Sequence, residues 1–328
     1  MFKAQDDDGS LIAFRAEMTT PVARLVCSKM LNEPMPLRLC YVSNVVRFKE
    51  RLDGYPREFW QAGVELIGHE GVEADAEVIA LMVIALRELG LSDVKVDIGH
   101  AGLFKRLLAL AKLRGDDVEK VKSLVLMKDS SGLKSLLTRS NRPSNLVKTF
   151  EVICRVRGLK ALDEILSLVS DQELMRIAEE VRELFSLLRG YEVQAHVSLD
   201  LSLIRGLDYY TGVIFEPYTS RFGRALGGGG RYDDLIESLI GKRVPATGFA
   251  LTVDYLIDAI GVEEILRRME KRRYVIIVPT SSSSYERALS KALELRSQGV
   301  IVEIHKIGDV EGARLRAEGL NGELMVVS

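Results

Sequence analysis

The alternation of apolar and polar residues predicts two neighbouring strands in the first third of the chain. Leu37–Phe48 (LRLCYVSNVVRF) is rich in β-branched residues and alternates in part, and Arg57–Gly68 (REFWQAGVELIG) alternates again. The pair Asp53-Gly54 between them is a turn signal, so we expect an antiparallel hairpin. Because side chains alternate along a strand, one face of the second strand carries Phe59, Gln61, Gly63, Glu65 and Ile67.

Apolar residues recur at helical spacing in three parts of the first 190 residues. Pro21–Leu31 is a predicted helix that ends at the breaker NEPMP, and Ala74–Leu89 is an amphipathic helix with Gly90 well placed as its C-cap. Between about 101 and 190 the strand signal nearly vanishes, which predicts a helical insertion with a loop at SNRPSN. The insertion contains four helical patterns: LFKRLLALAKL, VEKVKSLVLM, ALDEILSLVS and ELMRIAEEVRELFSLL.

The strand pattern returns after Tyr191. We expect strands at Val193–Asp200, Val213–Tyr218 and Arg224–Leu226, and helices at Asp233–Ile240 and Asp254–Ile260.

The last segment has the pattern of a small α/β domain. Arg273–Pro279 is a short apolar strand, Glu286–Gln298 a helix and Val300–His305 a second strand. This order predicts a βαβ unit with parallel strands. We therefore divide the chain into a core at 1–265 and a short C-terminal domain at 272–328.

Composition and charge are those of an ordinary globular protein. The chain has 328 residues, of which 47% are apolar and 28% charged, and its net charge is −2. This charge gives no reason to expect non-specific binding to nucleic acid or to an anionic membrane. No apolar run reaches the ~20 residues that span a bilayer, and MFKAQDDDGS lacks the features of a secretory signal. We therefore expect a cytoplasmic protein.

The cysteines and histidines do not predict a metal site. Cys27, Cys40 and Cys154 form no CxxC motif, and the plain interpretation is buried, reduced thiols. The four histidines are scattered and form no HxxxH pair.

Polar and aromatic residues gather in IRGLDYYTGVIFE at 204–216. Arg205, Asp208, Tyr209 and Tyr210 could bind a polar ligand at the rim of a pocket. The alternative is a surface loop with an aspartate-capped turn. The flanking apolar residues favour neither interpretation decisively.

Gln61 and Glu65 fall on the predicted buried face of their strand. A buried carboxylate needs a cationic or donor partner, or it must take up a proton. A ligand imidazolium or ammonium group would serve, and so would an internal salt bridge with an arginine, which is more common.

The run GGGG at 227–230 suggests backbone freedom next to a ligand or in a tight turn. A phosphate loop is the less favoured interpretation, because no GxGxxG opens a helix and no Walker lysine follows. Glu17 and Thr19 could simply cap the helix that starts near Pro21. Arg47 could be an ordinary arginine at a strand end.

Taken together, these motifs resemble a known family. AFRAEMTTPVAR, NVVRFKE, REFWQAGVELIG, ADAEVIAL, IRGLDYYTGVIFE, GGGGRYD and ATGFALTVDYL occur in the order of the catalytic domain of histidyl-tRNA synthetase. The resemblance covers most of residues 1–260 outside the helical insertion. It implies an α+β fold, in which the antiparallel sheet of a class II aminoacyl-tRNA synthetase is flanked by helices.

Several departures bring the chain closer to the non-catalytic branch of that family, the regulatory subunit of ATP phosphoribosyltransferase. In the third motif, GFALTVDYL replaces the synthetase pattern GFAxGxERL, so Thr252, Asp254 and Tyr255 stand where glycine, glutamate and arginine are expected. Tyrosine cannot make the charge-assisted fork of an arginine to phosphate. The second motif keeps Arg47 but reads VRFKER, and DIGHAGLF also resembles the regulatory branch.

The resemblance also implies a histidine pocket. Glu17, Thr19 and Gln61 would hold the α-amino group, and Glu65 and Tyr210 the imidazole with Tyr209 nearby. Arg47 and Arg205 would face the carboxylate or, in an active enzyme, the reacting phosphate. The backbone at Gly228 and Gly229 would approach the ligand closely. We expect no catalytic residue, metal or cofactor, with histidine as an allosteric ligand.

The implied partner is the short-form catalytic subunit of ATP phosphoribosyltransferase, bound by a homodimer within a hetero-oligomer. The N-terminal residues match a point after the first class II motif, which puts the independent stability of a dimer in question. Residues 274–328 are shorter than an anticodon-binding domain and resemble a vestige of one.

Two other functions remain open from the sequence. One is a divergent histidyl-tRNA synthetase, if Arg231 or Arg243 replaces the missing phosphate ligand. The other is a paralogue that binds a different amino acid.

Overall fold

The computed structural model describes residues 2–47, 56–204, 209–270 and 273–328. The chain forms two compact units, Met1–Ala259 and Ile260–Ser328. Each unit is described by itself below.

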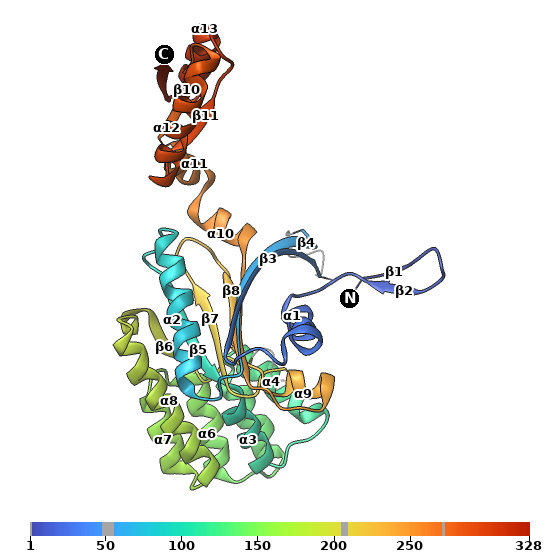
Figure 1. The fold of residues 1–328 in the computed structure, drawn as a ribbon. Helices are drawn as coiled ribbons and strands as arrows, with labels where there is room; N and C mark the ends of the chain where they lie inside the picture. The colour runs from blue at the N-terminus through green and yellow to red at the C-terminus, as the bar shows by residue number, and fades with distance from the viewer. Residues whose placement is uncertain (1, 48–55, 205–208, 271–272) are drawn as a thin grey trace. The chain divides into compact units, whose positions relative to one another are not determined.

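The first unit is built on a sheet of seven strands in the order β3-β4-β9-β8-β7-β5-β6 (Figure 1). Neighbouring strands are antiparallel except β5 and β6, which are parallel. The predicted antiparallel sheet is therefore confirmed. The strands are β3 (Leu37–Val46), β4 (Glu58–Ile67), β5 (Lys95–His100), β6 (Val197–Leu199), β7 (Val213–Tyr218), β8 (Gly227–Arg231) and β9 (Ala246–Thr252).

The hairpin of β3 and β4 confirms the prediction from alternation. Ser43 pairs with Gln61 and Tyr41 with Gly63 in the antiparallel register. Phe59, Gln61 and Glu65 are buried, while Trp60 between them is exposed. The predicted turn at Asp53-Gly54 lies outside the described residues.

The glycine run forms a strand, β8, in the middle of the sheet, so the predicted tight turn is wrong. The predicted strand at Arg224–Leu226 is also wrong, because β8 begins only at Gly227. A Cβ atom on Gly227 would lie 2.1 Å from the carbonyl oxygen of Ala250, and one on Gly229 would lie 2.2 Å from that of Gly248. These glycines let β8 and β9 approach more closely than residues with side chains would permit.

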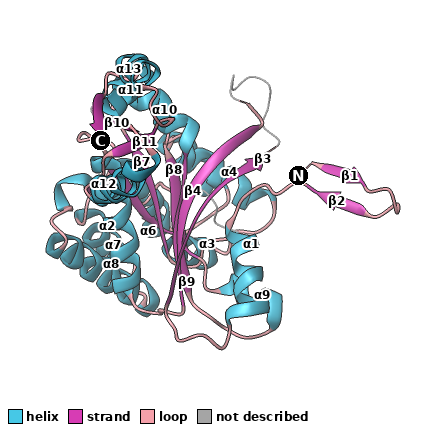
Figure 2. Ribbon diagram, turned by 45° about the horizontal axis from the view of Figure 1, so that its top comes forward, coloured by secondary structure: helices cyan, strands magenta, loops and turns pink. Residues whose placement is uncertain are grey.

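Helices flank this sheet, as predicted (Figure 2). α2 (Val72–Glu88) packs against the sheet and against α8. It ends before Gly90, whose φ of +88° supports the predicted capping role. α1 (Thr19–Leu25) continues into a π-helical turn, Val26–Met30, and α9 (Asp234–Ile240) and α10 (Val253–Ile260) lie near their predicted positions.

The predicted helical insertion is also confirmed. Its helices are α3 (Ala101–Leu110), α4 (Asp116–Leu126), α5 (Ser130–Arg139), α6 (Ser144–Arg155), α7 (Lys160–Leu168) and α8 (Gln172–Gly190). The sequence patterns did not single out α5 or α6. The predicted loop at SNRPSN begins where α5 ends, and α6 begins at Ser144.

Three smaller features of the structure differ from what the sequence predicted. Val193–Asp200 is a strand only at β6, because Gln194–His196 forms a 3-10 turn. A hairpin of β1 (Lys3–Gln5) and β2 (Leu11–Ala13) was not predicted. The cysteines are free, but none is fully buried: Cys27 and Cys154 are half-buried, and Cys40 is exposed because it lies on the outward face of β3.

The second unit contains a three-stranded parallel sheet, as the βαβ pattern predicted. β10 (Tyr274–Pro279) lies between β11 (Ile301–Ile304) and β12 (Glu323–Val327). α12 (Tyr285–Ser297) packs on the Val275 side of β10, and α13 (Val310–Gly319) packs on the Ile276 side. α11 (Val262–Glu270) precedes the sheet, and the serine run contributes the short turn Ser282–Ser284.

Candidate functional site

A cavity of about 540 Å³ in the first unit brings together the predicted site residues that the structure describes. Arg205 and Asp208 lie outside the described residues. The predicted residues that line the cavity are Glu17, Thr19, Arg47, Gln61, Glu65, Tyr209, Tyr210, Gly228 and Gly229.

The cavity walls come from segments far apart in the sequence. β4 supplies Gln61 and Glu65, β8 supplies the glycine backbone, and β9 pairs with both strands. The start of α1 and the residues just before β7 also contribute to the wall. Regular strands thus fix Gln61 and Glu65, which favours a preformed binding site.

Glu65 is the buried carboxyl group of the cavity, with 1% of its surface exposed. Its Oε2 accepts a hydrogen bond from the hydroxyl of Tyr232, while its Oε1 is buried and has no hydrogen-bond partner among the described residues. Burial raises the pKa of Glu65 to about 8, although the hydroxyls of Tyr232 and Thr19 lower it. This shift favours the protonated form of the carboxyl group near neutral pH.

No arginine or lysine among the described residues forms an ion pair with Glu65, so the internal salt bridge considered from the sequence is not present there. A ligand that donates a hydrogen bond or carries positive charge would complete its coordination.

Three more polar atoms in the cavity are buried without a hydrogen-bond partner among the described residues. They are Oη of Tyr41, Oε1 of Gln61 and Oη of Tyr209. Burial raises the pKa of both phenols, so these hydroxyls stay neutral and can donate. A buried polar group without a partner costs about 1–3 kcal/mol, and a polar ligand would remove that penalty.

Two glycines make room for these groups. A Cβ atom on Gly248 would lie 2.0 Å from Oε2 of Glu65, and one on Gly63 would lie 2.3 Å from Cζ of Tyr41. Neither glycine was singled out as a site residue from the sequence. The available signal was a glycine inside a strand, which is typical of a close approach by another group.

Glu17 and Arg47 lie at the edge of the cavity with contacts of their own. The carboxylate of Glu17 accepts a hydrogen bond from the backbone N–H of Thr20 at 3.1 Å, so it also caps α1, as the alternative interpretation suggested. The Nε of Arg47 donates to the carbonyl oxygen of Ala16 at 2.6 Å, and its guanidinium lies 5.5 Å from the centre of the Phe59 ring. Burial lowers the pKa of Arg47, and the nearby Glu17 opposes that change.

Tyr41 and Tyr232 are site residues that sequence reasoning missed. Tyr232 stacks on Tyr209, with ring centres 5.4 Å apart, and Tyr209 meets Tyr210 edge to face at 5.1 Å. Tyr232 was visible in the GGGGRYD motif. Tyr41 could be placed only once the register of β3 against β4 was known.

The residues that differ from the synthetase pattern line the same cavity. Thr252 and Tyr255 both contribute to its wall, and the Tyr255 ring lies 5.0 Å from that of Phe222. The position where the synthetase pattern has a phosphate-binding arginine is thus occupied by an aromatic ring.

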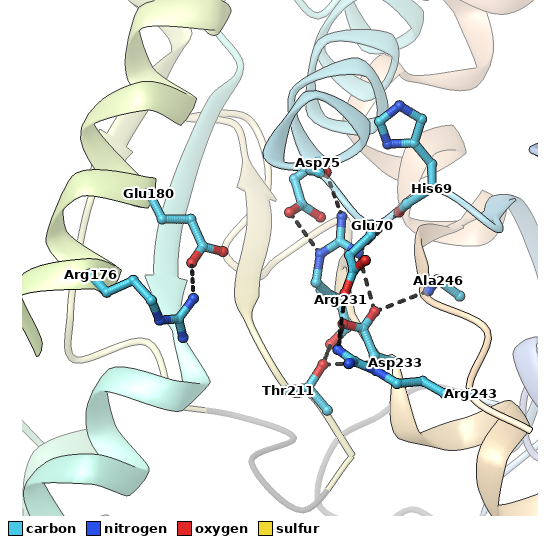
Figure 3. Close-up of polar contacts among 11 residues, drawn as sticks. His69, Glu70, Asp75, Arg176, Glu180, Thr211, Arg231, Asp233, Arg243 and Ala246 are labelled. Atoms are coloured by element: carbon cyan, nitrogen blue, oxygen red, sulfur yellow. Dashed lines mark hydrogen bonds and ion pairs between the residues drawn. The ribbon is translucent and has the colours of Figure 1, made fainter. Parts of the chain in front are cut away.

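Neither arginine considered as a substitute phosphate ligand lines the cavity. Arg231 is buried and donates to Asp75 at 2.9 Å and to Asp233 at 3.2 Å (Figure 3). Its guanidinium also donates to the carbonyl oxygens of His69 and Gly71. Arg243 lines a separate cleft and lies 3.4 Å from Glu70. Both guanidinium groups therefore serve other contacts.

Among the described residues, no cluster of three or more histidine, cysteine, aspartate or glutamate side chains has the arrangement of a metal site. In the same part of the chain, no helix has both the length and the apolar character of a membrane span.

Comparison with known sequences gives consistent matches over the whole chain. A family model described as histidyl-tRNA synthetase matches residues 1–256. An ATP phosphoribosyltransferase regulatory subunit from Clostridium kluyveri is 34% identical over 330 residues, covering 100% of this chain and 84% of that protein. A protein of the same name from Desulforamulus reducens is 36% identical over 302 residues, covering 92% and 75%.

Solved structures agree with these matches. A structure from Bacillus halodurans, described as an ATP phosphoribosyltransferase regulatory subunit/histidyl-tRNA synthetase, has a TM-score of 0.77 and 31% identity, covering 99% of this chain and 82% of that one. Histidyl-tRNA synthetase from Nostoc has a TM-score of 0.71 at 17% identity, covering 98% and 76%, which supports the fold alone.

Proposed function

The chain belongs to the histidyl-tRNA synthetase family, and we propose that it is a non-catalytic regulatory subunit of ATP phosphoribosyltransferase that binds histidine in its cavity. Its relatives named ATP phosphoribosyltransferase regulatory subunit match it over most of both chains, which supports a regulatory role in histidine biosynthesis. Histidine as the ligand is what the resemblance to this family implies, and the polar groups of the cavity support it.

The observation that carries histidine binding is the set of buried polar groups without partners around Glu65. The imidazole N–H of histidine would donate to Glu65, and Tyr210 would contact the ring. Gln61, Glu17 and Thr19 would hold the α-amino group. A pocket built on such groups discriminates against analogues that leave them unpaired.

The ligand carboxylate would lie toward Arg47, whose position at the cavity edge supplies positive charge. Arg205 would contribute by resemblance to the family, although it lies outside the described residues. Gly228 and Gly229 let the ligand approach the backbone of β8 without obstruction by a side chain.

Arg47 lines the cavity, but the arginine that the third motif of the synthetase pattern supplies for the phosphates of ATP is missing. Tyr255 stands at the expected position, and Arg231 and Arg243 are engaged elsewhere. Adenylation needs positive charge on the reacting phosphates, so these contacts support binding without catalysis.

Regulation would act through a complex in the cytoplasm. In this complex a homodimer of this chain would bind the short-form catalytic subunit. Histidine can shift the complex between active and inhibited states only if it binds the two states with different affinity. A coupling of about 1–3 kcal/mol is typical of such systems.

The proposal is tested by reconstitution with a purified short-form catalytic subunit. We expect co-elution of the two proteins, and a phosphoribosyl transfer rate that depends on histidine only when this chain is present. The Glu65→Gln chain should still co-elute but should lose the response to histidine. A catalytic subunit that neither binds this chain nor changes its rate would contradict the proposal.

The synthetase alternative is tested separately by histidine-dependent exchange of pyrophosphate into ATP. We expect no exchange above the background without enzyme. Exchange that is lost in the Glu65→Gln chain would show that Tyr255 does not abolish adenylation.

A further inference from the structure

A second cleft, of about 550 Å³, opens in the first unit between α3, α8 and the end of β8. Figure 3 shows Arg176 and Glu180 of α8 on one side and the contacts of Arg231 and Asp233 on the other. The cleft shares two segments with the cavity. Tyr210 lines the cavity while Thr211 lines the cleft, and Tyr232 lines the cavity between Arg231 and Asp233 of the cleft.

His100 at the start of α3 lines this cleft, with 5% of its surface exposed. Its Nδ1 accepts a hydrogen bond from the backbone N–H of Leu103 at 3.1 Å, which fixes the tautomer with a proton on Nε2. That Nε2 is buried and has no hydrogen-bond partner among the described residues. Burial, with a smaller effect of the Arg176 charge, lowers the pKa of His100 to about 3, so the ring is a neutral donor.

Lys105 supplies a positive charge one turn further along α3. Its Nζ donates to the carbonyl oxygen of Tyr210 at 2.9 Å, and no carboxylate among the described residues forms an ion pair with it. Two of the ammonium group's three hydrogens thus have no described acceptor.

The other cations of the cleft are neutralised by carboxylates. The pairs are Arg106 with Asp171 and Glu173, Arg176 with Glu180, Arg231 with Asp75 and Asp233, and Arg243 with Glu70. The remaining acid of the cleft, Asp234, lies in the first turn of α9, where the helix dipole stabilises its charge. Among the side-chain nitrogens that line the cleft, those of His100 and Lys105 are therefore the ones without a carboxylate partner among the described residues.

Gly102 keeps the space beside His100 open. A Cβ atom there would lie 3.1 Å from Cε1 of the His100 ring and 3.3 Å from the carbonyl oxygen of Thr211. Any side chain at this position would press on the ring. The sequence DIGHAGLF, which histidine binding leaves unexplained, thus places a buried donor next to a residue without a side chain.

We propose that the first turns of α3 form a second ligand site, which binds a small anion through a carboxylate or phosphoryl oxygen held by His100 Nε2 and Lys105. The positive end of the α3 dipole favours the same charge. The site stands independently of the regulatory role proposed above.

Lys105 gives this site a connection to the cavity. It holds the carbonyl oxygen of Tyr210, whose ring lines the cavity, so an anion that draws Lys105 toward itself would alter the cavity wall. We therefore expect the anion and histidine to change each other's affinity. This linkage rests on the proposed function, whereas the anion site does not.

The test is calorimetric titration of the full chain with malonate, inorganic phosphate and pyrophosphate at constant ionic strength. We expect saturable binding of at least one anion. Higher affinity for malonate would indicate a carboxylate ligand, and higher affinity for phosphate or pyrophosphate would indicate a phosphoryl ligand. His100→Asn keeps an acceptor for the Leu103 N–H but removes the Nε2 donor, and Lys105→Gln removes the charge. Each should weaken binding at least tenfold, while Lys148→Gln, an exposed lysine on α6, should leave binding unchanged.

Failure of all three anions to bind would overturn the site, as would equal binding by wild type and both variants. Thermal unfolding shows whether each variant is folded. Lys105 is exposed, so if His100→Asn does not fold, the anion affinity of Lys105→Gln tests the site. Imidazole NMR gives a second readout on the wild type, because the chain has only four histidines and the Nε2–H of His100 should shift with bound anion. Histidine affinity measured with and without saturating anion tests the linkage alone, and an unchanged value would overturn it.

Discussion

The hydroxyl of Tyr232 donates a hydrogen bond to Oε2 of Glu65, and both side chains are buried at the wall of the cavity. This bond joins β4 to the residue that follows β8. It also holds one oxygen of the carboxyl group and leaves the other without a partner among the described residues.

Tyr232→Phe should reduce the free energy of unfolding by about 1–3 kcal/mol, because it leaves a buried acceptor without its donor. Urea denaturation of the ligand-free protein measures the change. Tyr191→Phe is a matched control, since Tyr191 is exposed at the end of α8 and its hydroxyl change should have almost no effect. Equal stability of both variants and the wild type would show that the Tyr232–Glu65 bond contributes little.

The stability of the ligand-free protein should fall as pH rises from about 4.5 to about 8. Burial raises the pKa of Glu65 from its ordinary value of 4.5 to about 8, so in this window the folded state holds a proton that the unfolded state has lost. The contribution of one proton is at most about 1.4 kcal/mol per pH unit. Below the window both states are protonated, and above it both are ionised.

Glu65→Gln isolates this contribution, because glutamine does not titrate. The difference in unfolding free energy between variant and wild type, measured by denaturation across pH, should shift in favour of the variant as pH rises. A constant difference from pH 5 to pH 8 would mean that Glu65 titrates near its ordinary value.

Gly248→Ala should lower the free energy of unfolding by about 1–3 kcal/mol and weaken ligand binding, because its methyl group would overlap the Glu65 carboxyl. Gly190→Ala is the matched substitution, since a Cβ atom there meets no described heavy atom within 4 Å at the end of α8. It should be neutral or slightly stabilising. Denaturation and calorimetry on the two variants check both effects.

Asp75→Asn should lower the free energy of unfolding by about 3 kcal/mol, since it removes one charge of a fully buried ion pair with Arg231. Glu77→Gln, on the same helix, breaks the exposed pair with Arg38 and should change stability by less than about 1 kcal/mol. Thermal or urea unfolding of the two variants makes the comparison. Similar losses in both would contradict a special role for the buried network in Figure 3.

The strands that carry the cavity's polar groups could be predicted because their pattern is local. Alternation in β4 correctly placed Gln61 and Glu65 on the buried face. The glycine run misled the prediction, since glycine is more typical of turns than of central strands. Tertiary packing accounts for glycine in this central strand, because β8 must approach the carbonyl oxygens of β9 closely.

Tyr41 and the contacts of Arg231 could not be predicted from local patterns. Tyr41 meets Gly63 only through the register of two strands, and Arg231 meets Asp75 across 156 positions of the chain. The helix α5 was also missed, because SSGLKSLLTR buries only Leu133 and Leu137 and depends on its neighbours for stability.

Calorimetric titration of the purified chain with histidine tests the central claim most directly. We predict saturable binding of histidine, no binding of ATP under the same conditions, and at least a tenfold loss of histidine affinity in Glu65→Gln. A wild-type chain that does not bind histidine, or a Glu65→Gln chain that binds it equally well, would contradict a histidine site built around Glu65.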